Sequence, residues 1–250
     1  TEVSLKLYPE PAAKGTLIVS FDERKDAFGA VPAILKRGII PMALEYVEKE
    51  EIEMAAEDIG KTWPAQNGEY FLIIMLSEAK EDELFEIGAK IDEITAEFNA
   101  VDMLIAQSIS ERKDILDIRS HILPAISSKM VDSPDVTVPR GSLLEYLDRL
   151  NEIEEKYNTS CPVIAHAGDG NLHVLILKDN GGKPSYFEEI KKDIYQSAVD
   201  IGGTITGEHG VGKLRQDYLS MMYSERELEI MRQIKKVFDP NNILNAGRSI

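Results

Sequence analysis

Apolar residues along the first half of the chain follow two alternating periods. Short runs rich in apolar and β-branched residues, typical of strands, occupy positions 16–21, 40–48, 70–76 and 101–107. Segments with apolar residues at helical spacing occupy positions 26–38, where Gly38 marks the end, and 80–98. The strand, helix, strand order occurs twice. It predicts an α+β fold of ferredoxin-like β-α-β units that form an antiparallel sheet covered by helices.

The second half of the chain is predicted to continue with helices, a strand and a hairpin. A helix at 111–126 would bury four isoleucines on a face that excludes Arg119 and His121. Positions 135–139 favour a strand, and positions 142–157 favour a helix that Ser142 and Glu145 would start with a capping box. A helix at 186–201, a glycine-rich segment and a helical tail follow. No long linker divides the chain, so we expect one compact unit. The four buried isoleucines would be Ile115, Ile118, Ile122 and Ile126.

Charge and composition exclude several classes of protein. The formal net charge is −16, with 28 Lys and Arg against 44 Asp and Glu, which disfavours binding to nucleic acid or to anionic membrane surfaces. No run approaches the ~18 apolar residues of a transmembrane segment. The single Cys161 cannot form an internal disulfide, which fits a reducing compartment or simply little use of cysteine, and we expect a cytoplasmic protein. The opening Thr1 and the strand-like residues after it suggest a fragment of a longer polypeptide.

Three of the four histidines lie in two short motifs. His166 and His173 flank Asp169-Gly170, a dipeptide that favours a tight hairpin turn between apolar runs. A turn centred there would place the two imidazoles directly opposite each other, close enough to hold one divalent ion. A polar hairpin whose histidines bind no ligand is the alternative for this motif taken alone.

The second motif, GGTITGEHGVG at 202–212, has more glycine than a helix or strand tolerates. Its backbone must turn sharply or approach another group closely. Glu208 and His209 are neighbours, so in an extended segment one side chain could complete a metal site while the other faces a second reactant. A flexible surface loop and a phosphate-binding loop are the alternatives, although the motif matches neither G-x-G-x-x-G nor the P-loop.

Three motifs together resemble one known family. HAGDGNLH (166–173), GGTITGEHGVG (202–212) and FDPNNILNAG (238–247), in this order and spacing, are similar to the C-terminal domain of FAD-linked 2-hydroxy-acid oxidoreductases. This family includes relatives of glycolate oxidase, D-lactate dehydrogenase and D-2-hydroxyglutarate dehydrogenase. The resemblance implies that residues 1–10 are the end of a flavin-binding domain or a linker, and that residues 11–250 are the substrate or cap domain.

The resemblance also implies roles for individual residues. His166, His173 and Glu208 correspond to the ligands of a divalent metal, Zn²⁺ or a similar ion. His209 corresponds to the base that removes the proton of the substrate hydroxyl. The remaining correspondences are Arg119 and Asn171 with substrate-binding residues and Asn245 with a residue close to the flavin.

The implied activity is oxidation of a small D-2-hydroxy acid, such as glycolate or D-lactate, to the 2-oxo acid by an FAD-dependent dehydrogenase or oxidase. FAD would be bound mainly by a flavin-binding domain upstream or in a separate partner, because this sequence has no dinucleotide fingerprint. The chain alone is then expected to be inactive, and the sequence does not identify the electron acceptor. The alternative is a metal- or small-ligand-binding plait module without redox activity.

Overall fold

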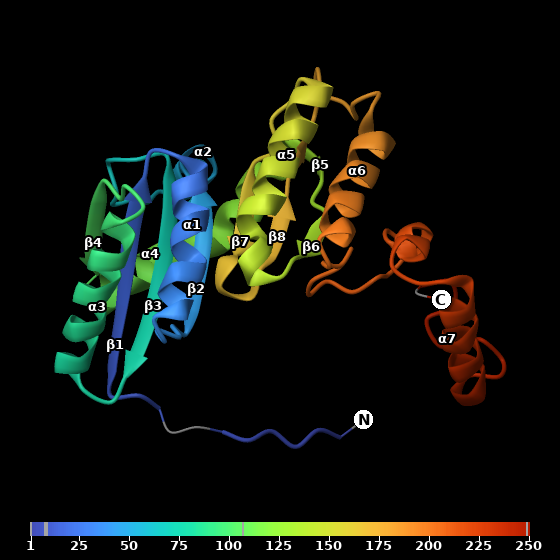
Figure 1. Ribbon diagram of the computed structural model, residues 1–250, viewed down its shortest axis with the longest axis horizontal. Helices are drawn as coiled ribbons and strands as arrows, with labels where there is room; N and C mark the ends of the chain where they lie inside the picture. The colour runs from blue at the N-terminus through green and yellow to red at the C-terminus, as the bar shows by residue number, and fades with distance from the viewer. Residues whose placement is uncertain (1, 8–9, 107, 249) are drawn as a thin grey trace.

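The computed structural model describes residues 2–7, 10–106, 108–248 and 250. Its first half contains the predicted plait (Figure 1). Four strands form it in the order β4-β1-β3-β2, and every pair is antiparallel. The elements are β1 (Ala13–Phe21), α1 (Arg24–Lys36), β2 (Ala43–Glu48), α2 (Lys49–Asp58), β3 (Tyr70–Glu78), α3 (Glu81–Ala96) and β4 (Asp102–Ala106). The α+β prediction is therefore confirmed, although Gln107 of the last expected strand lies outside the described residues.

Helices cover both faces of this sheet. On β1, Leu17 and Val19 pack with α1 and α3, whereas Ile18 between them packs with α2 and the later helix α4 (Ile109–Ile126). A strand buried on both sides has no need for polar alternation. This explains why the central strands have nearly continuous apolar sequences.

The second half of the chain extends the same sheet. Strands β7, β8 and β6 join it beyond β2, and the connection is the antiparallel pairing of Tyr46 with Ala165. The result is one seven-stranded sheet with a separate two-stranded pair, β5 and β9. The remaining elements are β5 (Met130–Asp132), β6 (Asp135–Thr137), η1 (Arg140–Ser142), α5 (Leu143–Tyr157), β7 (Val163–His166), η2 (Ala167–Asp169), β8 (Asn171–Val174), β9 (Ile176–Leu177), α6 (Phe187–Asp200), η3 (Gln216–Met221) and α7 (Glu225–Phe238).

Some local predictions were wrong. Strand β2 begins at Ala43 rather than Ile40, whose side chain is 85% exposed, and helix α2 was not predicted. Ser142 ends a 3₁₀ turn at φ −102° and ψ 8°, so its hydroxyl makes no cap hydrogen bond and the expected capping box is absent. An N-cap needs an extended backbone. The structure instead has capping boxes at Ser108 and Ser224, which begin α4 and α7.

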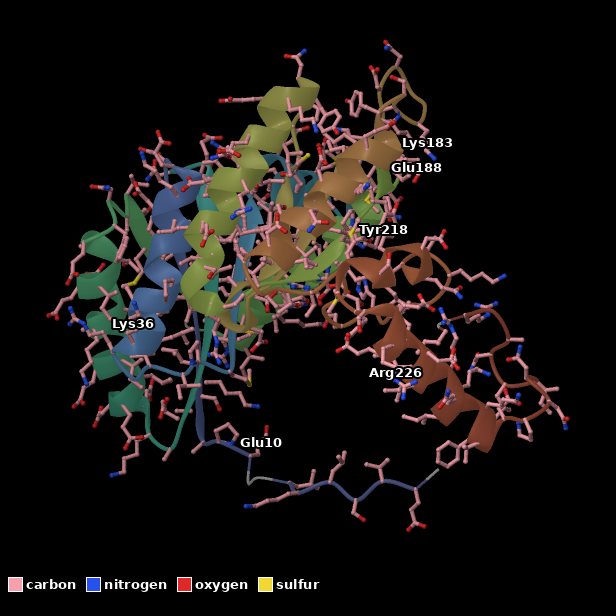
Figure 2. All side chains as sticks on the ribbon, turned by 45° about the vertical axis from the view of Figure 1, so that its right-hand side comes forward. Glu10, Lys36, Lys183, Glu188, Tyr218 and Arg226 are labelled. Atoms are coloured by element: carbon pink, nitrogen blue, oxygen red, sulfur yellow. The ribbon has the colours of Figure 1, made fainter. Side chains whose placement is uncertain are left out.

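The C-terminal part is set apart from the sheet. Figure 1 shows α7 at the side of the molecule, reached through η3. In Figure 2, Tyr218 of η3 lies near Lys183, which precedes α6, and near Glu188 in the first turn of α6, while Arg226 marks α7 farther out. The Tyr218 hydroxyl donates to Glu188 at 3.4 Å. Leu228 is the buried residue of α7 among those described, so most of this helix is open to solvent.

The first ten residues were expected to be the end of another domain or a linker. Residues 2–7 are exposed and have no regular secondary structure, whereas residues 1, 8 and 9 of the expected segment 1–10 lie outside the described residues. Within the described part of the chain, no helix is both long enough and apolar enough to cross a lipid bilayer.

Candidate functional site

The hairpin places His166 and His173 together, but in a different register from the one predicted. His166 pairs with Asn171, and His173 pairs with Ile164, because η2 centres the turn on Gly168-Asp169 rather than on Asp169-Gly170. A slip of two residues leaves every side chain on its original face of the sheet. The two histidines are therefore diagonal neighbours, with ring centroids 5.5 Å apart.

The third histidine joins them from the glycine-rich segment. His209 stacks on His173 with 5.1 Å between ring centroids. Glu208 Oε1 lies 3.2 Å from Nε2 of His166 and 3.5 Å from Nε2 of His173. We call His166, His173, Glu208 and His209 the histidine cluster. The glycine-rich segment is therefore held against the sheet.

A buried carboxylate that the sequence analysis missed holds this segment in place. Asp135, on β6 opposite His173, accepts hydrogen bonds at its Oδ2 from the backbone N–H groups of Gly207, Glu208 and His209, at 2.9–3.1 Å. Its Oδ1 accepts from the Asn171 side chain at 2.8 Å. Burial works to raise the pKa of Asp135, but these hydrogen bonds outweigh it and hold the pKa below the usual value. The carboxylate is thus ionised and fixes the backbone that carries Glu208 and His209.

Close approach of the backbone explains two of the glycines. A Cβ on Gly207 would lie 2.1 Å from Nδ2 of Asn171 and 2.6 Å from Oγ1 of Thr137. A Cβ on Gly203 would lie 2.4 Å from the carbonyl oxygen of Thr137. The prediction that this backbone approaches another group closely is confirmed, since both contacts are with strands β6 and β8.

His166 has a second buried carboxylate beside it. Glu45 of β2 lies with its Oε1 2.9 Å from Nδ1 of His166, and its Oε2 accepts a hydrogen bond from Arg119 of α4. The hydrogen bond to Glu45 raises the pKa of His166. Burial opposes ionisation of Glu45, but His166 and Arg119 together keep the pKa of its carboxyl group below the usual value. Arg119 therefore reaches the histidine cluster through an ion pair with Glu45.

His173 has a different environment. It is buried, and burial lowers its pKa to about 4. Its Nδ1 has no hydrogen-bond partner among the described residues and lies 3.7 Å from Oδ1 of Asp135. His173 is thus neutral near pH 7, which is the form that can bind a metal ion.

Two sets of side chains bring three potential ligand atoms within 4.8 Å of one another: His166, His173 and Glu208, and also Asp135, His173 and His209. The first set matches the predicted ligands. In the second set, the oxygens of Asp135 already accept hydrogen bonds from Asn171 and three backbone N–H groups. The ligand atoms of the first set are therefore more available to a metal ion than those of the second set.

The two asparagines of the sequence prediction lie in different places. Asn171 is buried, and its amide nitrogen donates to Asp135 and to the carbonyl oxygen of Val136. Asn245 is exposed in the loop after α7, with a positive φ of 48°. The structure therefore joins Asn171 to the site and leaves Asn245 on the separate C-terminal part.

Comparison with known sequences gives consistent matches over the whole chain. Residues 10–249 match the family described as FAD linked oxidases, C-terminal domain. A D-lactate dehydrogenase of Archaeoglobus fulgidus is 32% identical over 250 residues, covering 100% of this chain and 54% of that protein. The glycolate oxidase subunit GlcD of Bacillus subtilis is also 32% identical, covering 99% of this chain and 53% of that protein. The chain thus spans about half the length of these curated relatives.

Solved structures show the same fold at low sequence identity. The 4-ethylphenol oxidase of Gulosibacter chungangensis superposes with a TM-score of 0.66 at 11% identity, covering 96% of this chain and 54% of that one. p-Cresol methylhydroxylase gives a TM-score of 0.64 at 14% identity, covering 96% of this chain and 53% of that one. At these identities the likeness concerns the fold alone.

Proposed function

The chain belongs to the family of FAD-linked oxidase C-terminal domains, and we propose that it forms the substrate-binding part of an enzyme that oxidises a small D-2-hydroxy acid to the 2-oxo acid. Glycolate and D-lactate are the substrates that the names of the relatives suggest. The observation that carries the proposal is the convergence of His166, His173, Glu208 and His209 at one place on the sheet.

We further propose that His166, His173 and Glu208 hold a divalent cation, Zn²⁺ or a similar ion. Two imidazole nitrogens and one carboxylate oxygen are a common ligand set for catalytic zinc, and they leave a position open for substrate. A bound cation would stabilise negative charge on the substrate's hydroxyl oxygen. The proximity of the three ligand atoms and the neutral state of His173 support this assignment.

His209 is the proposed base. Its ring is partly exposed and stacks on His173, while its backbone is fixed by Asp135. Its Nε2 lies on the side of Glu208, 3.8 Å from Oε1. We therefore assign to this nitrogen the acceptance of the hydroxyl proton, a step that contributes typically ~10²–10⁴-fold to a rate.

Other residues of the chain bind and orient the substrate. Arg119 is proposed to bind the substrate carboxylate with the part of its guanidinium that Glu45 does not use. Its side chain is 23% exposed beside His166, which supports this role. Asn171 contributes by holding Asp135, and a direct contact with substrate would use its carbonyl oxygen, because its nitrogen is already engaged.

FAD is proposed to be bound mainly by a flavin-binding domain, upstream in the same polypeptide or in a separate partner. No glycine-rich dinucleotide fingerprint occurs in this sequence. Asn245 would contribute one contact near the flavin. The exposed position of the Asn245 side chain is compatible with a contact outside this chain.

Metal analysis of three variants tests the assignment in the complete enzyme. Glu208→Gln should lose the bound cation while the protein stays folded, whereas His209→Asn should keep it, and both should lose turnover. His121→Asn, which changes the histidine outside the cluster, should keep both. Equal metal loss in the first two variants would make His209 a ligand. A wild-type enzyme that binds the cation but neither flavin nor hydroxy acid would favour the plait module without redox activity.

A further inference from the structure

We propose that Glu45 is a positioning residue that fixes the orientation and the tautomer of His166, and that Arg119 holds Glu45 in this role. The inference rests on the proposed function only where it treats Nε2 of His166 as a metal ligand. The rest concerns three side chains that the fold brings together from β2, α4 and β7.

The hydrogen-bonding capacity of Glu45 decides which nitrogen of His166 carries hydrogen. An ionised carboxylate can only accept, so at 2.9 Å Nδ1 of His166 must donate to it. Arg119 Nη2 also lies 3.1 Å from this Nδ1. Arg119 donates its hydrogen bond to Oε2 of Glu45 instead, so it does not compete for Nδ1. In neutral His166, Nε2 is then the nitrogen that offers a lone pair to a cation shared with Glu208, whose Oε1 lies 3.2 Å away; only a protonated His166 could donate to both carboxylates. A carboxylate behind a metal-binding histidine commonly sets the ring in this way.

Arg119 makes this arrangement possible. The Glu45 side chain is 9% exposed, and an unpaired carboxylate at such a position would be strongly unfavourable. The guanidinium neutralises this charge and occupies the second carboxylate oxygen, which leaves Oε1 directed at His166. The buried isoleucine face of α4 holds Arg119 above the sheet.

The two histidines of the hairpin differ in whether a carboxylate accepts a hydrogen bond from Nδ1. No carboxylate among the described residues accepts a hydrogen bond from Nδ1 of His173, because Asp135 lies 3.7 Å away and is bonded to the glycine-rich segment. A change at Glu45 should therefore alter the ring of His166 and leave His173 unchanged. Such a selective effect would not follow from a general loss of packing.

Glu45→Gln offers a direct test, because glutamine has nearly the same shape. Arg119 can only donate, so it would hold the amide oxygen and leave the amide N–H₂ facing His166. The N–H₂ group needs an acceptor, so His166 should switch to the tautomer with hydrogen on Nε2. The lone pair would then point away from Glu208. We expect Zn²⁺ affinity to fall about 10- to 100-fold, the usual range for loss of such a partner.

The measurement is long-range ¹⁵N–¹H NMR of the chain labelled at histidine, at alkaline pH without metal, where four histidines give four ring systems. The matched control is Asp58→Asn, which alters the carboxylate 2.6 Å from Nε2 of His121 and should leave His166 and Zn²⁺ affinity unchanged. Circular dichroism confirms folding, and Glu45→Ala serves as a second variant, in which Arg119 should donate to Nδ1 of His166 and leave the hydrogen on Nε2.

An unchanged His166 tautomer in Glu45→Gln and in Glu45→Ala would overturn the inference. Zinc titration of the wild-type chain separates this result from a failure of the proposed function. If the wild type binds no Zn²⁺, the proposed ligand set fails, while the NMR spectra still decide the role of Glu45.

Discussion

Two buried carboxylates, Glu45 and Asp135, determine how the histidine cluster is built. Glu45 holds the ring of His166, and Asp135 holds the backbone of Glu208 and His209. Neither binds the proposed cation. Glu45 acts on the proposed ligand His166, and Asp135 acts on the proposed ligand Glu208 and on the proposed base His209. The geometry of the cluster is thus set by side chains from strands on either side of the hairpin.

Gly207→Ala should disrupt the glycine-rich segment, because the new Cβ would overlap with the side chains of Asn171 and Thr137. We expect a loss of roughly 1–3 kcal/mol in the free energy of unfolding and a weaker affinity for Zn²⁺. Urea unfolding and zinc titration measure the two effects. The control is Gly88→Ala in α3, where a Cβ meets no atom within 4 Å and should stabilise the helix by about 0.5–1 kcal/mol. Equal behaviour of the two variants would contradict the close approach at Gly207.

Arg119→Lys should raise KM for the 2-hydroxy acid about 10- to 100-fold in the complete enzyme, as expected for loss of a charged hydrogen bond. A lysine keeps the charge but lacks the planar fork that can contact Glu45 and a substrate carboxylate together. Steady-state kinetics provide the measurement. Arg149→Lys, at an exposed ion pair with Glu145, should behave like the wild type. An unchanged KM together with reduced metal content would leave Arg119 with the supporting role alone.

At the residue scale, the sequence was enough to select the histidines but not the two carboxylates, Glu45 and Asp135, that hold them in place. Histidines are rare here, and two motifs contain three of them, so they stand out. Glu45 and Asp135 do not stand out, because the chain has 44 acidic residues. Their signal was their position in short apolar strands, where a carboxylate is unusual unless it is paired.

Helix α2 shows how burial of an acidic residue affects stability at the scale of an element. Burial and the nearby Glu48 raise the pKa of Glu51 to about 7. Its proton is therefore bound more tightly in the folded chain than in the unfolded one. The stability contributed by Glu51 should be complete below pH ~4.5 and should fall as the pH rises to about 7.

Glu51→Gln removes this dependence. The difference in unfolding free energy between the variant and the wild type should shift in favour of the variant by on the order of 2 kcal/mol as the pH rises from 5 to 8. Urea unfolding at the two pH values checks this, and Glu53→Gln on the exposed side of α2 is the control. A difference that is the same at both pH values would contradict the raised pKa.

Element boundaries were predicted less well than element types. The hairpin was correct in kind, but its register depended on η2, and a 3₁₀ turn of three residues leaves little trace in hydrophobic periodicity. The error did not separate the histidines, because a slip of two residues preserves the face. Ser142 failed as a cap for a related reason, since the preceding 3₁₀ turn fixes its backbone away from the extended conformation.

At the scale of the whole molecule, α7 has the fewest buried residues among the described α-helices. Ile234, Val237 and Phe238 form an exposed apolar strip at helical spacing, with the Phe238 side chain 80% exposed. Exposed strips of this kind promote association between molecules.

Replacing Ile234 and Val237 together with lysine should reduce self-association of this chain and change its unfolding free energy by only about 0.5 kcal/mol. Sedimentation velocity and urea unfolding measure the two quantities. Leu228→Lys on the buried side of the same helix is the contrast, and it should release α7 from the rest of the chain. A large loss of stability in the double variant would show that the strip is packed in solution.

Strand β2 is shared by the plait and the histidine cluster, and this limits how the sequence can evolve. Glu45 faces His166, while Tyr46, its neighbour, is fully buried on the other side of the sheet. Insertion or deletion of one residue within the strand would exchange these two faces, placing a carboxylate in the apolar core and a phenol beside the imidazole. Substitutions can accumulate along β2 without this consequence. We therefore expect natural length variation among relatives to fall in the connections on either side of β2, and the strand itself to keep its length.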